Sequence, residues 1–516
     1  MRLIASVALA VLLGACETPP RTTQLETIRA PDRYGWPGDD NESREDTLFV
    51  VTASGGGTRA AALTLGTLRA LNEVRLSTAD RTLLGEVDII SSVSGGSVTA
   101  AYYALAGPEG FDKLERDFIR RDGISQLVLR LVNPVNVAEL LTDSRSRLDV
   151  LIDYLEDTLF DDKTYARLVE QRRRPYLILN AADMSEGAVF SFTQPQFDLI
   201  CADLVKFKLS EAVAASAAFP VALAPLTIKS YAPCNAQWAK YEERTGSGLK
   251  RRWPPLWIQN ALATDMDLNA NRTRRGRLAQ AYLNMNCDYE TQPPTCRAAP
   301  DNERKAWVHL LDGGIADNLG LNEPLRLVTT IDAQIKDSRG FLTQIFDGDI
   351  RNLVFVIVNA RSEADTNLDR SGSTPGIFKM LSATTGSAID AATFGMQDRL
   401  ARTVKELIQL RAQATALPKF INNAKQLNSY VVPVDFDYIE NPACRRFFKN
   451  IATSWTLEGH EIDALQSMAG ALVRRSRHFQ NLLTVYGAPP PDGPTVDAVC
   501  ETVVARQNPV RRSNTG

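Results

Sequence analysis

Acyl transfer by serine needs a nucleophile, a base that takes its proton and donors for the oxyanion, and three short segments of this sequence carry such residues. The first segment is Ser92-Val93-Ser94-Gly95-Gly96, which directly follows the apolar run Val87–Ser91 and precedes small, helix-compatible residues. This order predicts a tight strand-to-helix turn, with strained backbone at Ser94 and its hydroxyl pointing outward. Ser92 stands where such turns usually have a glycine, and serine is the next smallest polar residue.

The second segment is Gly55-Gly56-Gly57-Thr58-Arg59, which follows an apolar strand expected at Leu48–Thr52. Three successive unhindered amides can point into one concavity and bind an anion. Because both turns leave the carboxyl ends of predicted parallel strands, we expect this concavity to lie beside Ser94. Arg59 would orient the loop or meet a phosphate headgroup. A nucleotide-phosphate loop is the alternative, but the segment lacks the Lys-Ser/Thr that contacts nucleotide and metal.

The third segment offers a base. The chain has three histidines: His309, His460 and His478. Two of them fall among charged residues of a predicted helical region and one alternates with apolar residues on a strand, so a Ser-His-Asp triad has little support. Asp312 instead ends the apolar strand Trp307–Leu311, and Gly313-Gly314 make a turn tight enough for its carboxylate to reach the sheet edge. We predict Asp312 as the base, with a histidine as the alternative.

A parallel sheet is needed to bring these segments together. The first strand, a helix at Ala60–Val74, the second strand and the serine turn follow a βαβα order, which implies a parallel sheet with helices on its faces. Ser210–Ala218 is predicted as a buried, alanine-rich helix. Further strands are expected at Tyr176–Asn180, Trp307–Leu311, Leu353–Val358 and Tyr430–Val434, and long packing helices at Ile389–Gln413 and Leu457–Leu483.

The composition changes along the chain predict four regions: a signal peptide at 1–15, a tether at 16–46, a catalytic domain at 47–436, and a C-terminal helical extension and tail at 437–516. The domain carries a polar insertion at about 230–305 with basic clusters. Three tryptophans lie in it: Trp238, Trp253 and Trp257. The insertion is therefore either a contact with an anionic lipid surface or a solvated loop.

The N-terminus predicts export. Arg2 precedes Leu3–Gly14, an apolar run of 12 residues. This run is too short to span a bilayer of about 30 Å and is typical of a signal peptide. It ends in Leu13-Gly14-Ala15-Cys16, which resembles the bacterial lipobox, whose cysteine is lipidated; Glu17 rather than aspartate then favours the outer membrane. We expect an outer-membrane lipoprotein, with an ordinary signal peptide that happens to contain a cysteine as the alternative.

Six further cysteines permit three disulfides in an exported chain: Cys201, Cys234, Cys287, Cys296, Cys444 and Cys500. Cys287 and Cys296 flank Pro293-Pro294 and are the pair that we predict. A metal site is the alternative, but the cysteines lack C-x2-C spacing and a neighbouring histidine.

Length and composition exclude other classes. The chain has 516 residues, 44% hydrophobic and 23% charged, which is typical of a globular protein. Its net charge of −3 argues against nucleic acid as a partner, because phosphate neutralisation needs a basic surface.

The three segments together resemble the motifs of the patatin-like phospholipase family, in the family's order. Ser216-Ala-Ala-Phe-Pro220 is similar to a small-residue segment that the family carries between the last two motifs. The resemblance runs from about Thr47 to Asn359, interrupted by the insertion. It implies an α/β three-layer sandwich with a mostly parallel central sheet, an inserted cap region and C-terminal helices. It also implies a Ser94–Asp312 dyad without histidine, Gly55–Gly57 as the oxyanion loop, and no metal or other cofactor.

The function that this resemblance implies is hydrolysis of acyl esters in phospholipids or related lipids. A lysophospholipase, thioesterase or acyltransferase could use the same dyad. A catalytically weak scaffold at the outer membrane is the non-enzymatic alternative, against which the intact Ser94 and Asp312 argue. Ala60, where the family often has glycine, and Ser92 depart from its pattern without removing a catalytic group.

Overall fold

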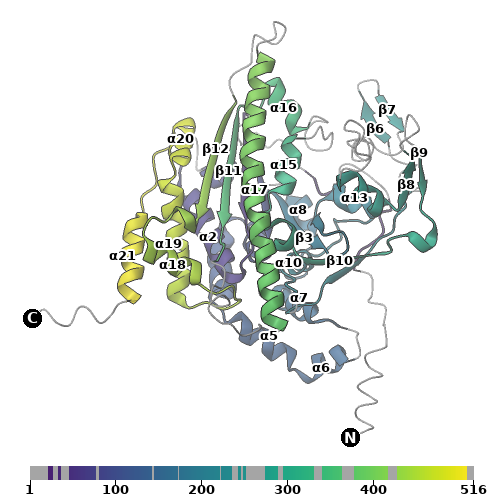
Figure 1. Ribbon diagram of the computed structural model, residues 1–516, viewed down its shortest axis with the longest axis horizontal. Coiled ribbons are helices and arrows are strands. Elements are labelled where there is room, and N and C mark those ends of the chain that lie inside the picture. Colours follow the sequence, from purple (N-terminus) through teal and green to yellow (C-terminus); the bar gives the residue numbers. More distant parts are fainter. Residues whose placement is uncertain are drawn as a thin grey trace, which may run out of the picture.

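The fold was analysed in a computed structural model that describes residues 21–26, 33–35, 46–76, 81–141, 145–171, 174–220, 222–234, 242–245, 248–251, 274–288, 295–329, 340–362, 377–415 and 427–507. One mixed sheet of eight strands forms the centre of the molecule (Figure 1). The strands are β1 (Thr47–Ala53), β2 (Ile89–Val93), β3 (Tyr176–Asp183), β4 (Ala188–Ser191), β5 (Leu226–Lys229), β10 (Trp307–Asp312), β11 (Asn352–Asn359) and β12 (Asn428–Asp435).

The strand order is β12-β11-β1-β2-β3-β10-β5, with β4 also paired to β3. The first five strands in this order are parallel, whereas β10, β5 and β4 are antiparallel to their neighbours. All six strands that the apolar runs predict are present, and the mostly parallel α/β sheet is confirmed. β1, β2, β3 and β11 are buried along their whole length, which explains their continuous apolar sequence.

Helices cover both faces of the sheet. Ser91 and Ser92 are neighbours on β2, so their side chains point to opposite faces. The Ser92 hydroxyl meets Ser97 on α3, whereas the Ser91 hydroxyl donates to the carbonyl of Gly320, just before α15. The described part of the molecule therefore has three layers, as predicted. The helices up to this point of the chain are α2 (Gly57–Glu73), α3 (Ser94–Ala106), α4 (Phe111–Leu114), α5 (Gly123–Leu131), α6 (Pro134–Leu141), α7 (Arg147–Leu155), α8 (Tyr165–Gln171), α9 (Gln194–Leu199), α10 (Leu209–Ser216), α13 (Arg274–Leu283), α14 (Gly314–Asp317) and α15 (Asn322–Thr329).

A single long helix, α17 (Ile377–Thr415), crosses the front of the molecule (Figure 1). It packs on α14, α15 and the short α16 (Phe341–Asp347). The sequence predicts this helix from Ile389 onward, and the structure extends it by more than three turns toward its N-terminus. Its packing on α14 brings it next to the residues that follow Asp312.

The C-terminal region packs directly on the core. Its helices are α18 (Pro442–Asn450), α19 (Gly459–Arg475), α20 (Arg477–Tyr486) and α21 (Val496–Gln507). α19 lies along α2, and a disulfide between Cys444 and Cys500 joins α18 to α21. The single helix predicted at Leu457–Leu483 is wrong, because Ser476 has extended backbone and its hydroxyl caps a new helix by accepting the Phe479 amide.

Described parts of the insertion form two small hairpins and α13. The hairpin strands are β6 (Glu242–Thr245), β7 (Gly248–Arg251), β8 (Met285–Asp288) and β9 (Thr295–Ala298). Cys287 pairs in register with Cys296, but their side chains lie outside the described residues, as do the three tryptophans; the predicted disulfide remains a prediction. Cys201 and Cys234 form a second disulfide.

Two pieces of the segment predicted as a tether contact the domain. The Leu25 amide donates to the Cys201 carbonyl, and the Tyr34 hydroxyl is bonded to the backbone of Leu177. Residues 1–20, with Cys16, lie outside the described part, so the region boundaries stay predictions. Within the segments that the structure describes, no helix has both the length and the apolar character to cross a membrane.

Candidate active site

The turn between β2 and α3 holds Ser94 in strained backbone. Its φ angle is 51°, in the left-handed region that non-glycine residues rarely adopt. The strain prediction is confirmed. The Ser94 amide donates to the Ser216 hydroxyl at 2.8 Å, and this contact ties the turn to the end of α10. The next residue must be glycine, because a Cβ on Gly95 would lie 2.0 Å from the Gly57 carbonyl oxygen.

Asp312 reaches Ser94 on an antiparallel strand. β3 pairs Asn180 with Val93, the residue before Ser94, and continues to Asp183. β10 pairs in the antiparallel direction with this last part of β3, so its last residue, Asp312, lies opposite Ala181. A glycine must follow it, since a Cβ on Gly313 would lie 2.2 Å from the Asn180 carbonyl oxygen.

The two side chains meet at hydrogen-bond distance. The Ser94 hydroxyl donates to Asp312 Oδ2 at 2.7 Å, and the Gly314 amide donates to Asp312 Oδ1 at 2.8 Å. The Ser94 and Asp312 residues are only 7% and 5% exposed. This contact brings together two residues that are 218 positions apart in the chain, as the motifs predict.

Burial raises the pKa of the Asp312 carboxyl. Loss of water raises its pKa from 3.8 to about 6, and the hydrogen bonds from Ser94 and Gly314 oppose this rise. The carboxylate is therefore present at neutral pH and is also a stronger base than an exposed aspartate. A base with a pKa near the working pH suits proton transfer.

The glycine-rich loop lies against the dyad. A Cβ built on Gly55 would be 3.3 Å from the Ser94 Cβ, and Gly57 has a φ of 59°. Among the described residues, the amides of Gly56, Gly57 and Gly95 donate to no protein acceptor, so they are available to an oxyanion. The Gly55 prediction is corrected, because its amide already donates to the backbone and side-chain oxygens of Asn318 at 3.3 and 3.2 Å.

Arg59 lies beneath this loop, inside the protein. It is 2% exposed, and it donates to the carbonyls of Ala360 and Ile451 and to the Thr453 hydroxyl. Burial lowers its pKa to about 10, so it stays charged at neutral pH. Of its two predicted roles, the geometry supports orientation of the loop. A contact with a lipid headgroup is excluded, because the guanidinium does not reach the surface.

The loop at 451–456 packs against the glycine-rich loop. The Ser454 carbonyl accepts the Thr58 amide at 2.8 Å, and a Cβ on Gly57 would lie 2.5 Å from that same carbonyl oxygen. The C-terminal region therefore holds the oxyanion loop, together with the bond from Arg59 to Ile451. The sequence carries no local signal for this contact.

Serine hydroxyls form a chain behind the nucleophile. Ser97 Oγ contacts the hydroxyls of Ser92 and Ser216 at 3.1 and 2.9 Å, and Ser216 Oγ donates to the Asn180 carbonyl at 2.6 Å. Ser92 thus fills the usual glycine position with a side chain that has its own hydrogen-bond partner. Ser216 is the first residue of the Ser216–Pro220 segment, to which the sequence analysis gives no role at the site, and Asn318 was not singled out; the structure places both in contact with the site.

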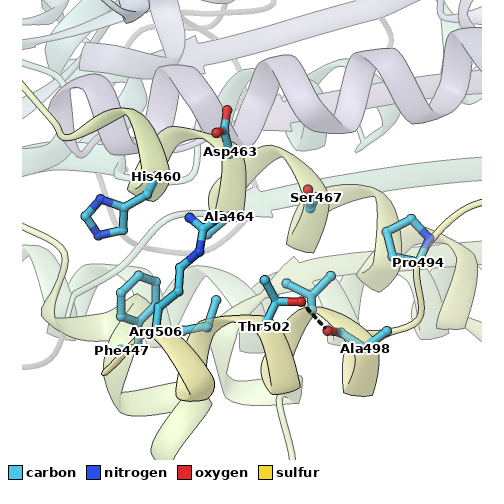
Figure 2. Close-up of a pocket in the computed structure, with 11 residues that line it drawn as sticks. Phe447, His460, Asp463, Ala464, Ser467, Pro494, Ala498, Thr502 and Arg506 are labelled. Atoms are coloured by element: carbon cyan, nitrogen blue, oxygen red, sulfur yellow. Dashed lines mark hydrogen bonds between the residues drawn. The ribbon is translucent and has the colours of Figure 1, made fainter. Parts of the chain in front are cut away.

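No histidine takes part in the dyad. His309 Nδ1 contacts the Thr227 hydroxyl at 2.9 Å, and His460 and His478 are exposed on α19 and α20. His460 lines a cavity of about 340 Å³ between α18, α19 and α21 (Figure 2). Ser94 is not among the residues that line it. The described residues form no cluster of three or more His, Cys, Asp or Glu side chains that could hold a metal ion.

Comparisons with known proteins found a similarity that includes Ser94 and the glycine-rich loop. Residues 51–241 match the family model of patatin-like phospholipases. Two solved structures of human GIVD cytosolic phospholipase A2 are similar to the chain. One, in complex with methyl gamma-linolenyl fluorophosphonate, is 19% identical, with 28% of this chain and 23% of that chain covered and a TM-score of 0.22. The other is 11% identical, with 97% and 63% covered and a TM-score of 0.36.

The chain thus spans less than two thirds of the length of these solved structures. No curated protein sequence matches the chain.

Proposed function

We propose that this protein, which carries a patatin-like phospholipase domain over residues 51–241, hydrolyses acyl esters of membrane lipids through Ser94 and Asp312. The observation that carries the proposal is the hydrogen bond of 2.7 Å from the Ser94 hydroxyl to Asp312 Oδ2, at a strained turn beside unpaired loop amides. A nucleophile, a base and oxyanion donors in one place are the minimum that acyl transfer requires.

In the first step, Ser94 Oγ attacks the ester carbonyl carbon while Asp312 accepts its proton. The carbonyl oxygen becomes an oxyanion, which the amides of Gly56, Gly57 and Gly95 stabilise. The positive end of the α3 dipole and the buried Arg59 charge add to this stabilisation. The tetrahedral intermediate then collapses, and the protonated Asp312 returns its proton to the departing alcohol.

In the second step, Asp312 accepts a proton from water as the water oxygen attacks the acyl-serine. Collapse of the second intermediate releases the fatty acid and returns the proton to Ser94 Oγ. Each step leaves Asp312 ready for the next, which suits a carboxyl whose pKa of about 6 lies close to neutral pH.

The cellular setting is also part of the proposal. Disulfides such as Cys201–Cys234 and Cys444–Cys500 persist in oxidising compartments. They agree with the signal peptide and the lipidated Cys16 that the sequence predicts. We infer an exported lipoprotein of the outer membrane, whose substrate lies in the membrane that carries it.

A fluorophosphonate probe tests the dyad on the purified protein. The probe should attach covalently to Ser94, as peptide mass spectrometry can show, and Ser94→Ala should remain unlabelled. Folded wild-type protein that resists the probe would remove the hydrolase proposal and favour the scaffold alternative.

Product analysis separates the related activities. Mass spectrometry of a bacterial lipid extract, incubated with wild type or Ser94→Ala, should show Ser94-dependent release of free fatty acid. A dominant acyl ester of an added alcohol would instead indicate an acyltransferase, and selective loss of thioesters would indicate a thioesterase.

A further inference from the structure

The helices α5 and α6 expose an apolar face. Six exposed apolar side chains lie on α5, on α6 and between them, and are called here the docking face: Ile124, Val128, Leu129, Val132, Val135 and Val137. Leu129, Val132 and Val135 are the most open, at 63%, 63% and 64%. A cluster of exposed apolar side chains marks an interaction surface in a water-soluble domain.

The charged residues of the same helices are paired. The stretch 123–141 contains two charged residues, Arg130 and Glu139, and both are half-buried. Arg130 pairs with Asp157 at 2.8 Å, and Glu139 pairs with Arg145 at 3.0 Å. The two charged side chains of these helices are therefore held in ion pairs, while the most exposed large side chains of the helices are apolar.

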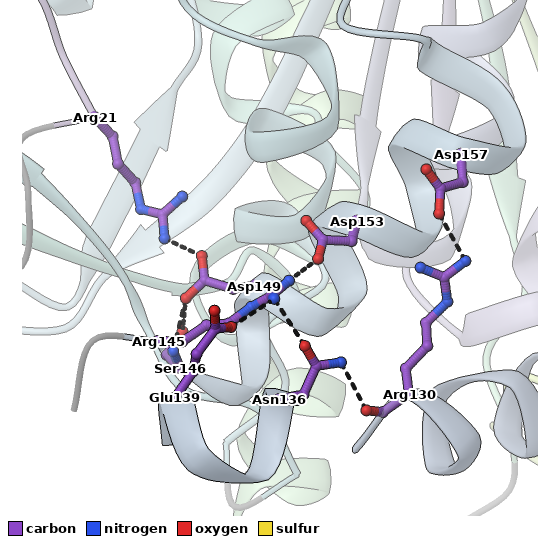
Figure 3. A network of polar contacts seen from close by, with 9 residues as sticks. All are labelled: Arg21, Arg130, Asn136, Glu139, Arg145, Ser146, Asp149, Asp153 and Asp157. Atoms are coloured by element: carbon purple, nitrogen blue, oxygen red, sulfur yellow. Dashed lines mark hydrogen bonds and ion pairs between the residues drawn. The ribbon is translucent and has the colours of Figure 1, made fainter. Parts of the chain in front are cut away.

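A connected polar network holds the two helices in this orientation (Figure 3). Asn136 donates to the Arg130 carbonyl at 2.7 Å and accepts from Arg145 at 2.9 Å, and Arg145 also pairs with Asp153 on α7. These contacts tie both α5 and α6 to α7. The docking face is consequently presented by a supported pair of helices.

The chain that leads to the predicted lipid anchor enters the molecule at this network. Arg21 pairs with Asp149, which also accepts from the backbone and hydroxyl of Ser146 next to Arg145 (Figure 3). Cys16 is five residues before Arg21, and an extended chain advances at most about 3.6 Å per residue, so Cys16 lies within about 18 Å of Arg21. An acyl chain on Cys16 would enter a bilayer close to α6.

The start of α5 is linked by hydrogen bonds to the loop that holds Thr58. The Ile124 amide donates to the Thr456 hydroxyl at 3.1 Å, and that hydroxyl donates to Asp122 at 2.6 Å. Thr456 belongs to the loop whose Ser454 carbonyl holds the Thr58 amide. One short segment therefore joins the start of α5 to the catalytic site.

We propose that the docking face binds the surface of a lipid bilayer, inserting Leu129, Val132 and Val135 among the lipid chains beside the active site. This inference rests on the proposed function, which places the substrate in a membrane. With one positive and one negative charge in α5 and α6, each held in an ion pair, the face suits a neutral, zwitterionic lipid surface and needs no anionic headgroup. A protein partner or a second copy of the chain is the alternative that the test must separate.

The test uses the full chain with Cys16→Ser, so that no acyl chain at that position contributes to binding. The docking variant carries Leu129→Gln, Val132→Gln and Val135→Gln. The matched control carries Met184→Gln, Leu410→Gln and Tyr438→Gln, which replace apolar residues on other elements that are 57%, 48% and 56% exposed. Glutamine favours helix more than valine does, so α5 and α6 are expected to fold in the docking variant.

Flotation with phosphatidylcholine vesicles measures binding. The docking variant should bind at least about 100-fold more weakly than the background chain, whereas the control should bind within about twofold of it. Binding should also survive high salt, because it depends on apolar contact. Equal vesicle binding by the docking variant and the background chain would overturn the proposal, as would light scattering that shows a dimer dissociated by the docking substitutions without any effect on vesicles.

Two substrates separate this inference from the proposed function. The docking variant should hydrolyse soluble p-nitrophenyl butyrate at the wild-type rate and lose hydrolysis of vesicle phosphatidylcholine. If the background chain hydrolyses neither ester while its vesicle binding still depends on the docking face, docking is supported and the hydrolase proposal falls. If the docking variant hydrolyses both esters at the same rates as the background chain, the docking proposal is wrong and the hydrolase proposal stands.

Discussion

The sheet edge that carries Ser94 and Asp312 buries charge, whereas the docking face exposes apolar side chains. At the edge, Asp312 and Arg59 lie almost fully inside the protein, where an ionised group is costly unless hydrogen bonds support it. On α5 and α6, Leu129 and Val132 are open to solvent, while Arg130 is held in an ion pair. Charged groups are usually exposed and large apolar side chains usually buried, and the two regions depart from this rule in opposite directions. The buried charge at the edge is what the proposed catalysis needs, and the exposed apolar side chains of the docking face are what the proposed membrane binding needs.

The comparison also shows how each departure is supported. Asp312 is held by backbone and side-chain donors from Gly314 and Ser94, so its neighbours are small and close. The docking face is supported from behind by ion pairs and amide contacts of α6 and α7. Substitutions at the edge should therefore affect turnover of every ester, and substitutions on the face should affect only membrane-bound substrate.

Ser94→Ala should give the largest effect. It removes the nucleophile, so kcat/KM for both p-nitrophenyl butyrate and vesicle phosphatidylcholine should fall by about 10⁴–10⁶-fold. Initial rates on the two substrates measure this loss, and vesicle flotation should stay at the wild-type level. Residual activity within tenfold of wild type would show that another residue is the nucleophile.

Asp312→Asn should reduce kcat/KM for both substrates by about 10²–10⁴-fold, because the amide cannot accept the serine proton. Steady-state rates check this, with vesicle flotation again as the control for the docking face. Retained activity would return the role of base to one of the histidines.

Asp312→Asn should also make the folded protein more stable than wild type in alkaline solution. Burial raises the pKa of Asp312 from 3.8 to about 6, so its contribution favours the folded state at low pH and is lost as the pH rises through about 6. At pH 8 the buried carboxylate costs about 3 kcal/mol relative to an exposed one. Thermal unfolding should show Asp312→Asn more stable than wild type at pH 8 and similar to it at pH 4.

The pH profile should reveal the ionisation of the base. Since the carboxylate form of Asp312 accepts the proton, kcat/KM for p-nitrophenyl butyrate should be constant above about pH 7 and fall tenfold per unit below about pH 6. A buffer series with the soluble substrate measures this without interference from vesicle binding. A midpoint near pH 4 would indicate a base exposed to water.

Ser216→Ala should give the smallest of these effects at the edge. It leaves the Ser94 amide without its acceptor, so the turn is held less firmly and kcat should fall by about tenfold with little change in KM. Rates on the soluble ester measure both constants, and the pH midpoint should not move. A changed KM with unchanged kcat would show that Ser216 acts on substrate binding instead.

Much of the site could be predicted from local sequence. The order Gly-Gly-Gly, Ser-x-Ser-Gly-Gly and Asp-Gly-Gly, each after an apolar strand, predicts the turns, the strain at Ser94 and the meeting of Ser94 with Asp312. Such motifs can be recognised because a strained turn needs small residues at fixed positions within a few residues of each other. The parallel strands are equally readable, since burial on both faces requires continuous apolar sequence.

Only the tertiary structure decided which backbone amides near Ser94 remain without a protein acceptor and which apolar side chains remain exposed to solvent. Asn318 takes the Gly55 amide from 263 residues away, and Ser216 accepts the Ser94 amide from 122 residues away. Neither contact belongs to a repeating pattern, because it depends on how distant elements pack. The same holds for α5 and α6: their sequence shows amphipathic spacing, but periodicity alone cannot say which side faces the protein. The partners of the charged residues of α5 and α6 are Arg145 and Asp157, which lie outside those helices.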